Sequence, residues 1–474
     1  MRSDPGSANL RAYLACLASA IALTLAPAAL GAPDEESEPK APPDRGTPGP
    51  YISRSVRPDG VTRQACDLTL PICVWAAPTA TNVSSVLAAA AAAWRALVHT
   101  LGFPAPDLSL ETGAWDVLVV RDALAPGEES ATRVEWRDTR STYDRAQGFT
   151  LVDASLRAGC RLDAALARAL ADAIRLRVAP AIDRASALAQ TTYLAELVAP
   201  CRVALSADAA HAFQSRPAEC IADARVDGAP HAVDELTAPS HAARLFSAGS
   251  AAFYARTEWA YARRPGSLVW STWALTPTQT PLGSRRWHDE PDTFDILRKS
   301  FESALFTGST LHDLMLDFGV ARAFMGSADD GLHHPESRAL GDSARVTPDW
   351  DVPWPATPKR YPQRAPVAPT GASYLIVSTR GAPEHARLRV EIEWEEHALF
   401  RWAIVKLDRE GRELGRLAIP TRERATSSQM SVVDLSGADR LMLVGVNVGD
   451  PAYRFDPDDA VWEPHGWLVT IAAE

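Results

Sequence analysis

The sequence predicts an α+β protein in which strands and helices are segregated along the chain. A strand–helix–strand–strand beginning is followed by a long series of helices, and a period-two apolar pattern then takes over toward the C-terminus. Segregation of this kind, without regular alternation of strand and helix, is typical of α+β folds. We therefore expect a small N-terminal sheet, a mostly helical remainder and a C-terminal antiparallel β-sandwich.

The N-terminus has the features of an export signal. A run of apolar and small residues follows Arg2 and Arg11 and ends in small residues. We expect residues 1–32 to be a signal peptide cleaved near Gly31 or Ala32, so that the protein is secreted or periplasmic. The alternative is an uncleaved anchor, because the run approaches membrane-spanning length. No later stretch is expected to span a membrane, so no stable transmembrane anchor is expected after cleavage.

Composition indicates the character of the next segment and limits the partners. Residues 33–50 are rich in proline and acidic residues and cannot bury enough apolar surface to order, so we expect a disordered tether. The formal net charge of the chain is −11. A nucleic-acid partner requires a basic face, and this charge balance argues against such a partner.

The elements of the first domain follow from apolar spacing. Leu162, Leu166, Leu170 and Ile174 recur every four residues and form one stripe of a helix. The expected strands are 68–75, Trp115–Arg121 and Gly148–Asp153. The expected helices are 80–101, 161–178, 183–199, 204–214, 248–263, 266–275, 291–305 and 309–326. The segment 215–245 is expected to be irregular.

A second domain is expected near the C-terminus. The prolines of 348–370 predict a linker between one domain at 51–347 and another at 371–474. From Leu388 to Trp394, apolar and charged residues alternate, as in a half-buried strand. The strands expected after it are 400–407, 413–419, 429–435, 440–448 and 466–473. Short strands joined by turns favour a β-sandwich.

Five cysteines remain beyond the expected signal peptide, and an odd number leaves at least one thiol unpaired. The preferred disulfide is Cys160–Cys201, because its bond would join the two ends of a predicted helical hairpin. The second is Cys66–Cys73, although a buried free thiol at Cys73 fits the sequence equally well. Exported chains keep disulfides, and the absence of a CxxC pair argues against a zinc site built from cysteines.

Familiar catalytic motifs are absent from the sequence. It contains no GxxxxGK phosphate loop, no GxSxG elbow and no HExxH zinc motif. Its histidines are scattered, and only His333 and His334 are neighbours. They lie with several acidic residues in the expected loop 329–336. That loop is either a metal or substrate site, with His333, His334 and Glu336 as candidates, or a solvated polar loop.

Three stretches carry a resemblance to a known family. These are the turn Leu101–Asp107, the strand beginning Trp115-Asp116-Val117, and the helix segment Ala189–Glu196. Residues 65–325 resemble, in the order and spacing of elements, the secreted metalloproteases of myxobacteria. The resemblance implies a zincin-like fold, a helix bearing HExxH and a following helix that supplies a glutamate. Glu196 matches the place of that third zinc ligand.

The sequence departs from this family where the metal would bind. On the predicted helix 161–178, the stretch Arg161–Leu170 contains no imidazole. Zinc requires nitrogen, sulfur or carboxylate donors, so zinc is not expected, and without it no activated water forms. Glu196 is then either a weak remnant ligand or a surface charge of its helix.

Two further features suggest ligands. Asp456, Asp458 and Asp459 crowd one loop, where carboxylates either coordinate Ca²⁺ or remain solvated, so calcium is the one cofactor left open. Fourteen tryptophans are many for this length. The candidates for stacking on sugars, with core packing as the alternative, are Trp350, Trp354, Trp394, Trp402, Trp462 and Trp467.

Three functions are compatible with these features. The first is an exported, metallopeptidase-like protein that has lost its zinc site and acts by binding an envelope or extracellular protein or polysaccharide. The second is a secreted hydrolase with an unrecognised site around His333 and Glu336. The third is a carbohydrate-binding envelope protein.

Overall fold

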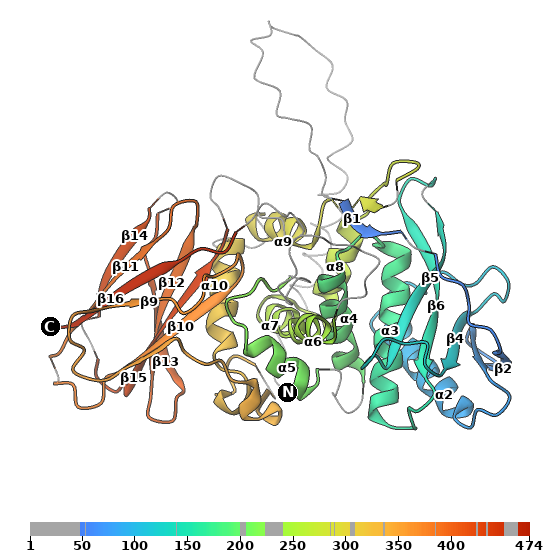
Figure 1. Ribbon diagram of the computed structural model, residues 1–474, viewed down its shortest axis with the longest axis horizontal. Helices are drawn as coiled ribbons and strands as arrows, with labels where there is room; N and C mark the ends of the chain where they lie inside the picture. The colour runs from blue at the N-terminus through green and yellow to red at the C-terminus, as the bar shows by residue number, and fades with distance from the viewer. Residues whose placement is uncertain are drawn as a thin grey trace, which may run out of the picture. The chain divides into compact units, whose positions relative to one another are not determined.

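The computed structural model describes most of the chain from residue 48 onward (Figure 1). The described range is 48–474, except for 53, 139, 200–204, 223–239, 285, 289, 304–308, 335–336, 384, 423–424, 433–434 and 450–462. The expected signal peptide 1–32 and most of the expected tether lie outside it. The end of the tether is not irregular, because β1 (Pro48–Tyr51) pairs with β7 (Arg286–His288).

The first sheet has five strands in the order β2-β3-β4-β6-β5. Its strands are β2 (Thr62–Cys66), β3 (Ile72–Ala76), β4 (Trp115–Val120), β5 (Ser130–Asp138) and β6 (Arg145–Asp153). The three central strands are parallel, and the edge strands β2 and β5 are antiparallel to their neighbours. The central three match the strands predicted from apolar runs. The edge strands were not predicted, because they are only partly buried and carry no such run.

Two helices cover one face of this sheet. They are α2 (Val83–Trp94), which continues as a π-helix (Arg95–Thr100), and α3 (Cys160–Val178). The predicted stripe of Leu162, Leu166 and Leu170 is buried in the core beneath the sheet. A hydroxyl of β5 links the sheet to α3, because Ser130 Oγ donates to the Ala165 carbonyl over 2.8 Å.

By length and apolar composition, Val83–Thr100 is the one helix in the described ranges that could cross a membrane. No such stretch was expected, and the criterion is met because of the alanine run in α2. Val86, Ala90 and Trp94 of this helix are buried against the sheet and α3. One face of this helix therefore belongs to the core.

The helical part follows. Its helices are α4 (Arg184–Val198), α5 (Ala207–Gln214), α6 (His241–Gly249), α7 (Ala251–Tyr261), α8 (Ser267–Leu275), α9 (Thr293–Glu302) and α10 (Leu311–Arg322). Asp183, Ser206 and Thr310 cap three of them in the way that short polar side chains favour. The helix expected at 248–263 is in fact α7, and α6 begins inside the segment expected to be irregular.

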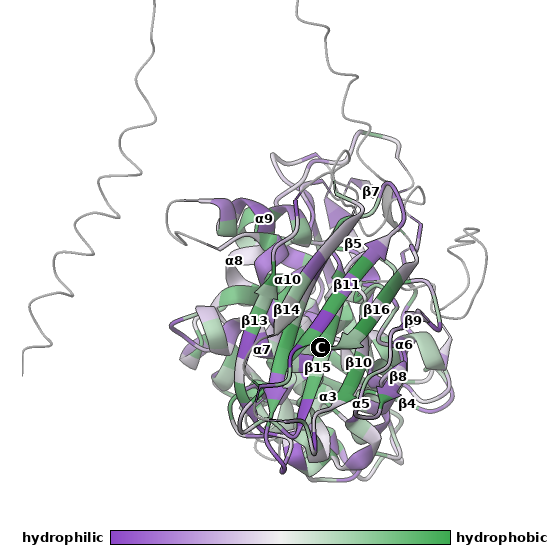
Figure 2. Cartoon of the chain, turned by 90° about the vertical axis from the view of Figure 1, so that its left-hand side faces the viewer, coloured by the Kyte–Doolittle hydropathy of each residue, from purple (hydrophilic) through white to green (hydrophobic). Residues whose placement is uncertain are grey.

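Two further sheets follow the helices. The strands are β8 (Trp350–Val352), β9 (Lys359–Pro362), β10 (Ala372–Ser378), β11 (Leu388–Trp394), β12 (Phe400–Leu407), β13 (Glu413–Ile419), β14 (Ser427–Val432), β15 (Arg440–Asn447) and β16 (Trp467–Ala473). One sheet has the order β13-β12-β15-β10-β8, and the other β14-β11-β16-β9. Figure 2 shows the second of these sheets with its alternating hydrophilic and hydrophobic residues. The segment 348–370, expected to be a linker, supplies an edge strand to each sheet.

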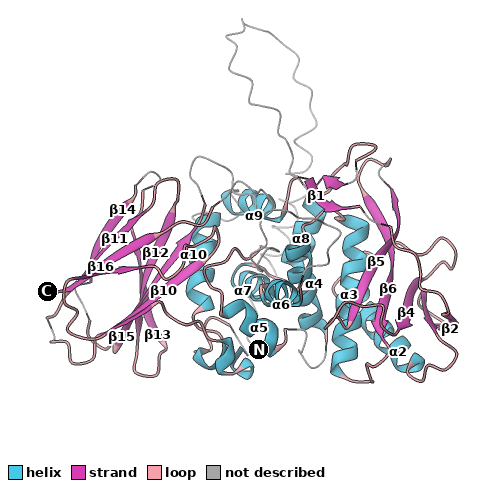
Figure 3. Cartoon of the chain, in the orientation of Figure 1, coloured by secondary structure: helices cyan, strands magenta, loops and turns pink. Residues whose placement is uncertain are grey.

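The described residues, from Pro48 onward, belong to one compact unit. The two C-terminal sheets share an apolar core, which includes Val390, Ile404 and Val469. The sheet β13-β12-β15-β10-β8 packs its other face against α10 (Figure 3). The contact is close at Gly319, where an added Cβ would lie 2.5 Å from Val446 Cγ2. The two expected domains therefore share a continuous core across this helix.

Candidate functional site

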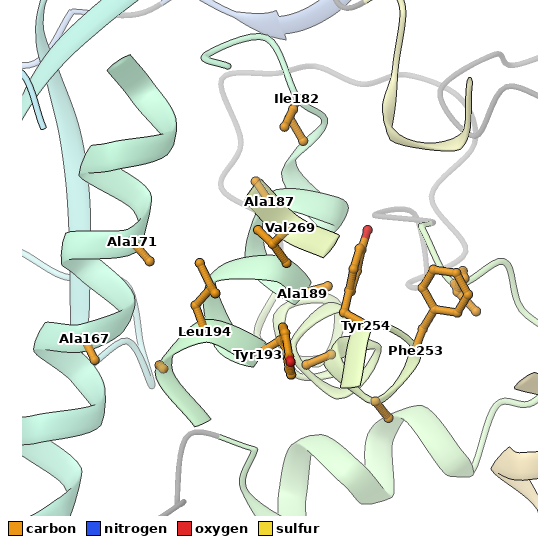
Figure 4. Close-up of a cluster of buried hydrophobic side chains, with 14 of the residues drawn as sticks. Ala167, Ala171, Ile182, Ala187, Ala189, Tyr193, Leu194, Phe253, Tyr254 and Val269 are labelled. Carbon is orange, nitrogen blue, oxygen red and sulfur yellow. The ribbon is translucent and has the colours of Figure 1, made fainter. Parts of the chain in front are cut away.

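The pair α3 and α4 is where the family resemblance locates a metal. Figure 4 shows Ala167 and Ala171 of α3 directed toward α4, with Leu194 of α4 between the helices. Both alanines are buried. Residues four apart on a helix share one face, which is the spacing of the two histidines in HExxH. If such a motif lay at 167–171, the place of its glutamate would be occupied by Arg168.

Glu196 does not face α3, contrary to the role that the resemblance gave it. Two residues correspond to about 200° around a helix, so Glu196 lies on the side of α4 opposite Leu194. Its carboxylate is half-buried and accepts the Leu205 backbone N–H over 3.0 Å. The polar residue within about 40° of Leu194 is Gln190, four positions earlier. The resemblance matched a glutamate at position 196, but it did not account for the direction in which this side chain points from α4.

Gln190 is the centre of a buried polar network. Its side chain is completely buried, and its Oε1 accepts the indole N–H of Trp273 over 2.7 Å. Its amide nitrogen lies 3.2 Å from Thr293 Oγ1 and 3.4 Å from the Tyr254 hydroxyl. Burial, followed by the charge of Asp183, raises the pKa of Tyr254, so its hydroxyl keeps its proton. The network joins four helices and closes the space between them.

The residues present at this place do not fit a zinc ion. Methyl groups of Ala167 and Ala171 and an amide already bonded to an indole offer none of the donors that zinc prefers. In the ranges that the structure describes, no group of three or more His, Cys, Asp or Glu could hold a metal ion. Burial lowers the pKa of the Arg168 guanidinium, and the nearby carboxylates of Glu129 and Glu128 oppose that change. A cation at 168 would also repel a metal ion.

A second buried network lies beside the first. Glu258 of α7 is only 5% exposed and accepts backbone N–H groups of Gly266 and Leu268 at the start of α8, together with the hydroxyl of Tyr193. Burial raises the pKa of Glu258, and these hydrogen bonds oppose it. The carboxylate therefore caps α8. Nothing in the sequence signals this role, because the partners are brought together by the fold.

His333 is held on both sides by carboxylates. Its Nδ1 lies 2.8 Å from Asp330 Oδ1 and its Nε2 lies 2.7 Å from Glu413 Oε2. The ring stacks on Phe324 with centroids 4.0 Å apart, and the side chain is 3% exposed. Burial would raise the pKa of Glu413, but the hydrogen bonds and charges of His333 and Arg416 lower it to about 2. We call Asp330, His333, Glu413 and Arg416 the histidine cluster.

Arginines extend the histidine cluster to the helices. Arg416 lies 3.0 Å from His333 Nε2 and pairs with both Glu413 and Asp317. Arg256 of α7 holds Asp317 from the other side and donates to the His333 carbonyl. The cluster thus links α7, α10 and strand β13.

A β-bulge in β13 makes this arrangement possible. Gly415 pairs with Lys406 and Glu413 with Leu407, so Leu414 has no partner in the opposite strand. In a regular strand, residues three apart point to opposite faces. The extra residue brings Glu413 and Arg416 to the same face, where both reach His333. The sequence predicted the acidic loop but not this partner strand.

The neighbouring His334 has different surroundings. It is 6% exposed, and burial, with the charge of Arg256, lowers its pKa to about 3. Its ring is therefore neutral in the core beside Phe318. Neither histidine presents an accessible nitrogen for acid–base chemistry, since both nitrogens of His333 are engaged. Glu336, the third candidate of this loop, lies outside the described residues.

The cysteines confirm one expected disulfide. Cys66 and Cys73 face each other across β2 and β3 and are bonded, with Cα atoms 4.1 Å apart. Cys160 is also disulfide-bonded. Cys201, expected as its partner, lies outside the described residues, so that pairing stays a prediction. Cys220 keeps a buried thiol, which accepts a hydrogen bond from Thr370.

Three of the six tryptophans proposed for sugar stacking are core residues. Trp394, Trp402 and Trp467 are 6%, 1% and 3% exposed and fill the space between the C-terminal sheets. Trp350 and Trp354 are half-buried. Trp462 and the calcium candidates Asp456, Asp458 and Asp459 lie outside the described residues.

Comparisons with known proteins give no relative for this chain. No protein-family profile and no curated protein matches the sequence. Among solved structures, the tailspike protein 4 enzymatically active domain of bacteriophage CBA120 is 12% identical, with 24% of this chain and 15% of that chain covered and a TM-score of 0.17. The VP2 subviral particle of infectious bursal disease virus is 8% identical, with 24% and 32% covered and a TM-score of 0.15. The match spans less than a third of either structure.

Proposed function

We propose that this protein is an exported, non-catalytic binding protein built on a metallopeptidase-like scaffold that carries a C-terminal β-sandwich. The mixed sheet with an antiparallel edge strand, and α3 lying beneath it, support the scaffold. The observation that carries the proposal is the composition of the α3–α4 interface. Ala167, Ala171 and Gln190 stand where a metallopeptidase of this build would hold its ion.

The loss of catalysis follows from the chemistry of those side chains. A metallopeptidase uses its ion to generate hydroxide near neutral pH, which requires donors that hold the ion. The Gln190 amide is committed to Trp273 and the neighbouring hydroxyls. A general base is also missing at this place, because a guanidinium at Arg168 does not accept protons.

The hydrolase alternative has less support. A general base must reach a substrate proton through a free nitrogen or carboxylate. His333 is held between Asp330 and Glu413, and His334 is neutral and buried. This geometry suits a cluster that fastens β13 to the helices.

The cysteines support the expected export. Disulfides persist in oxidising compartments and are rare in the cytosol. The Cys66–Cys73 bond joins the edge strand β2 to the sheet, and Cys160 at the start of α3 is also bonded. Binding at the cell envelope or outside the cell is compatible with both.

Metal analysis of the purified full chain tests the proposal. We expect less than a tenth of an equivalent of zinc after dialysis against excess zinc, and no hydrolysis of casein above a heat-treated sample. Glu196→Ala serves as a matched variant, because it removes the carboxylate that the resemblance named. One tightly held equivalent of zinc together with peptidase activity would overturn the proposal, whether or not Glu196→Ala removes them.

A further inference from the structure

A cluster of aromatic and cationic side chains lies on the edge strands of the two C-terminal sheets. β8 is the edge strand of one sheet and β9 that of the other. The indole N–H of Trp350 on β8 donates to the Pro362 carbonyl at the end of β9 over 2.7 Å. The Tyr361 ring meets Trp350 edge-on with centroids 5.7 Å apart. The indole is thus fixed in place at the side of the two sheets.

Two cations surround this aromatic pair. Lys359 Nζ lies 6.0 Å from the Trp350 centroid and 5.5 Å from that of Tyr361, and the Arg364 Cζ lies 5.6 Å from the Trp350 centroid. Both side chains belong to exposed residues. Over the described ranges, no carboxylate lies within 4.0 Å of either cation. We call Trp350, Lys359, Tyr361 and Arg364 the cationic aromatic cluster.

A carboxyl group that interacts with Arg364, that of Asp349, loses its charge in mild acid. Asp349 precedes Trp350, and burial raises its pKa to about 6, while Arg364 opposes the change. Below that pH the cluster is purely cationic.

We propose that the cationic aromatic cluster binds an acidic polysaccharide, with sugar carboxylates on Lys359 and Arg364 and a sugar ring against Trp350. Arginine and lysine are the side chains that hold carboxylates, and an indole supplies an apolar face. A uronate polymer carries one charge per sugar and needs only a small cationic footprint. Nucleic acid, with a charge about every 1.7 Å, needs a wider basic face than these two side chains supply. This proposal names a ligand class for the binding function proposed above and rests on it.

The same residues have a simpler explanation as edge protection. Lysine on an edge strand discourages pairing with another chain. That role accounts for Lys359 within β9, but Arg364 lies beyond the end of the strand and still reaches the indole. Arg360 provides the control, because side chains alternate along a strand and Arg360 points to the face opposite Tyr361.

The test is retention of the full chain on immobilised polygalacturonate at low salt and pH 5, with neutral dextran and duplex DNA as comparison ligands. We expect retention on polygalacturonate alone. Lys359→Gln with Arg364→Gln should weaken it roughly threefold to tenfold, as expected for two exposed charge contacts. Arg360→Gln should change it less than twofold.

Three outcomes would overturn the proposal. They are a lack of retention on polygalacturonate, equal retention on dextran or DNA, and unchanged retention of the double variant. The result is separable from the metal analysis. A chain that holds zinc yet binds polygalacturonate through these residues would overturn the proposed function and leave this site standing.

Discussion

Replacing Glu413 with glutamine should destabilise the protein and change the way its stability depends on pH. The carboxylate accepts hydrogen bonds from His333 and Arg416 and has a pKa of about 2, against an ordinary value of 4.5. A carboxyl group whose pKa is depressed in the folded state stabilises that state when ionised. The contribution is complete above pH 4.5 and is lost as pH falls through 2.

The magnitude follows from the pKa difference. Each pKa unit corresponds to about 1.4 kcal/mol, so a shift of this size corresponds to about 3 kcal/mol at neutral pH. The Glu413 side chain remains 12% exposed and belongs to a cluster that reaches the surface, so solvent screening reduces this to about 1.5 kcal/mol. At pH 3 the unfolded carboxyl is protonated but the folded one is still ionised. More than half of the contribution is then gone, and about 0.6 kcal/mol remains.

Urea unfolding followed by tryptophan fluorescence measures the effect. At pH 7, Glu413→Gln should lower the midpoint by about 0.5 M, for an m-value on the order of 3 kcal/mol/M. The difference from the unsubstituted chain should shrink by more than half at pH 3. Glu410→Gln, on the same hairpin but 63% exposed, should leave the midpoint unchanged at both pH values. A loss for Glu413→Gln that is equal at pH 7 and pH 3 would refute the reasoning.

Three further predictions concern other parts of the chain. Cys66→Ala with Cys73→Ala should cost roughly 2.5 kcal/mol, the loop-closure entropy of a bond between residues seven apart, and reductant should lower the thermal midpoint of the unsubstituted chain more than that of this variant, which keeps the bond at Cys160. Gly319→Ala should lower the thermal midpoint, because overpacking against Val446 costs about 1–3 kcal/mol and exceeds the roughly 1 kcal/mol that alanine gains in a helix; an unchanged midpoint would mean that the contact relaxes freely. Retention on polygalacturonate should strengthen as pH falls below about 6, where Asp349 becomes neutral, and Asp349→Asn should abolish that pH dependence.

The helical stripes and central strands were predictable, because burial imposes a period on the sequence. The four-residue stripe of α3 is buried from Leu162 to Ile174. The strands β4 and β6 carry apolar runs because both faces of the sheet are covered. The edge strands β2 and β5 were missed for the converse reason. β2 is mostly exposed and β5 is partly buried along nearly its whole length, so neither strand alternates between a buried and an exposed face.

The prediction of a linker at 348–370 was wrong because prolines occur in edge strands as well as in irregular segments. Seven prolines between 348 and 370 indicate breaks in regular structure. They do not exclude edge strands, where a missing N–H faces solvent and costs nothing. Pro362 ends β9 in this way and still offers its carbonyl to Trp350. Only the partner strands β10 and β16 reveal the pairing.

The candidate site was predicted in part. The concentration of acid and imidazole around His333 was visible, and Asp330 lies within the same loop. Glu413 is 80 residues away from His333 in the sequence. Its contact with His333 depends on a β-bulge that the local sequence does not predict. Gln190 was within reach of the sequence, since a polar residue four positions from Leu194 on an apolar helix face is a buried polar group by period alone.

The Gln190 network and the histidine cluster stabilise the fold with different desolvation costs. Gln190 is uncharged, so its burial costs only the exchange of water for protein hydrogen bonds, and Trp273 and Thr293 satisfy it. The histidine cluster buries charges, whose desolvation cost is recovered only while every partner is present. The α3–α4 interface should therefore tolerate pH change, whereas the contact between β13 and the helices should fail first in acid. Loss of that contact would free the C-terminal sheet that contains β13 from α7. The same sheet would separate later from α10, where the packing at Gly319 is apolar.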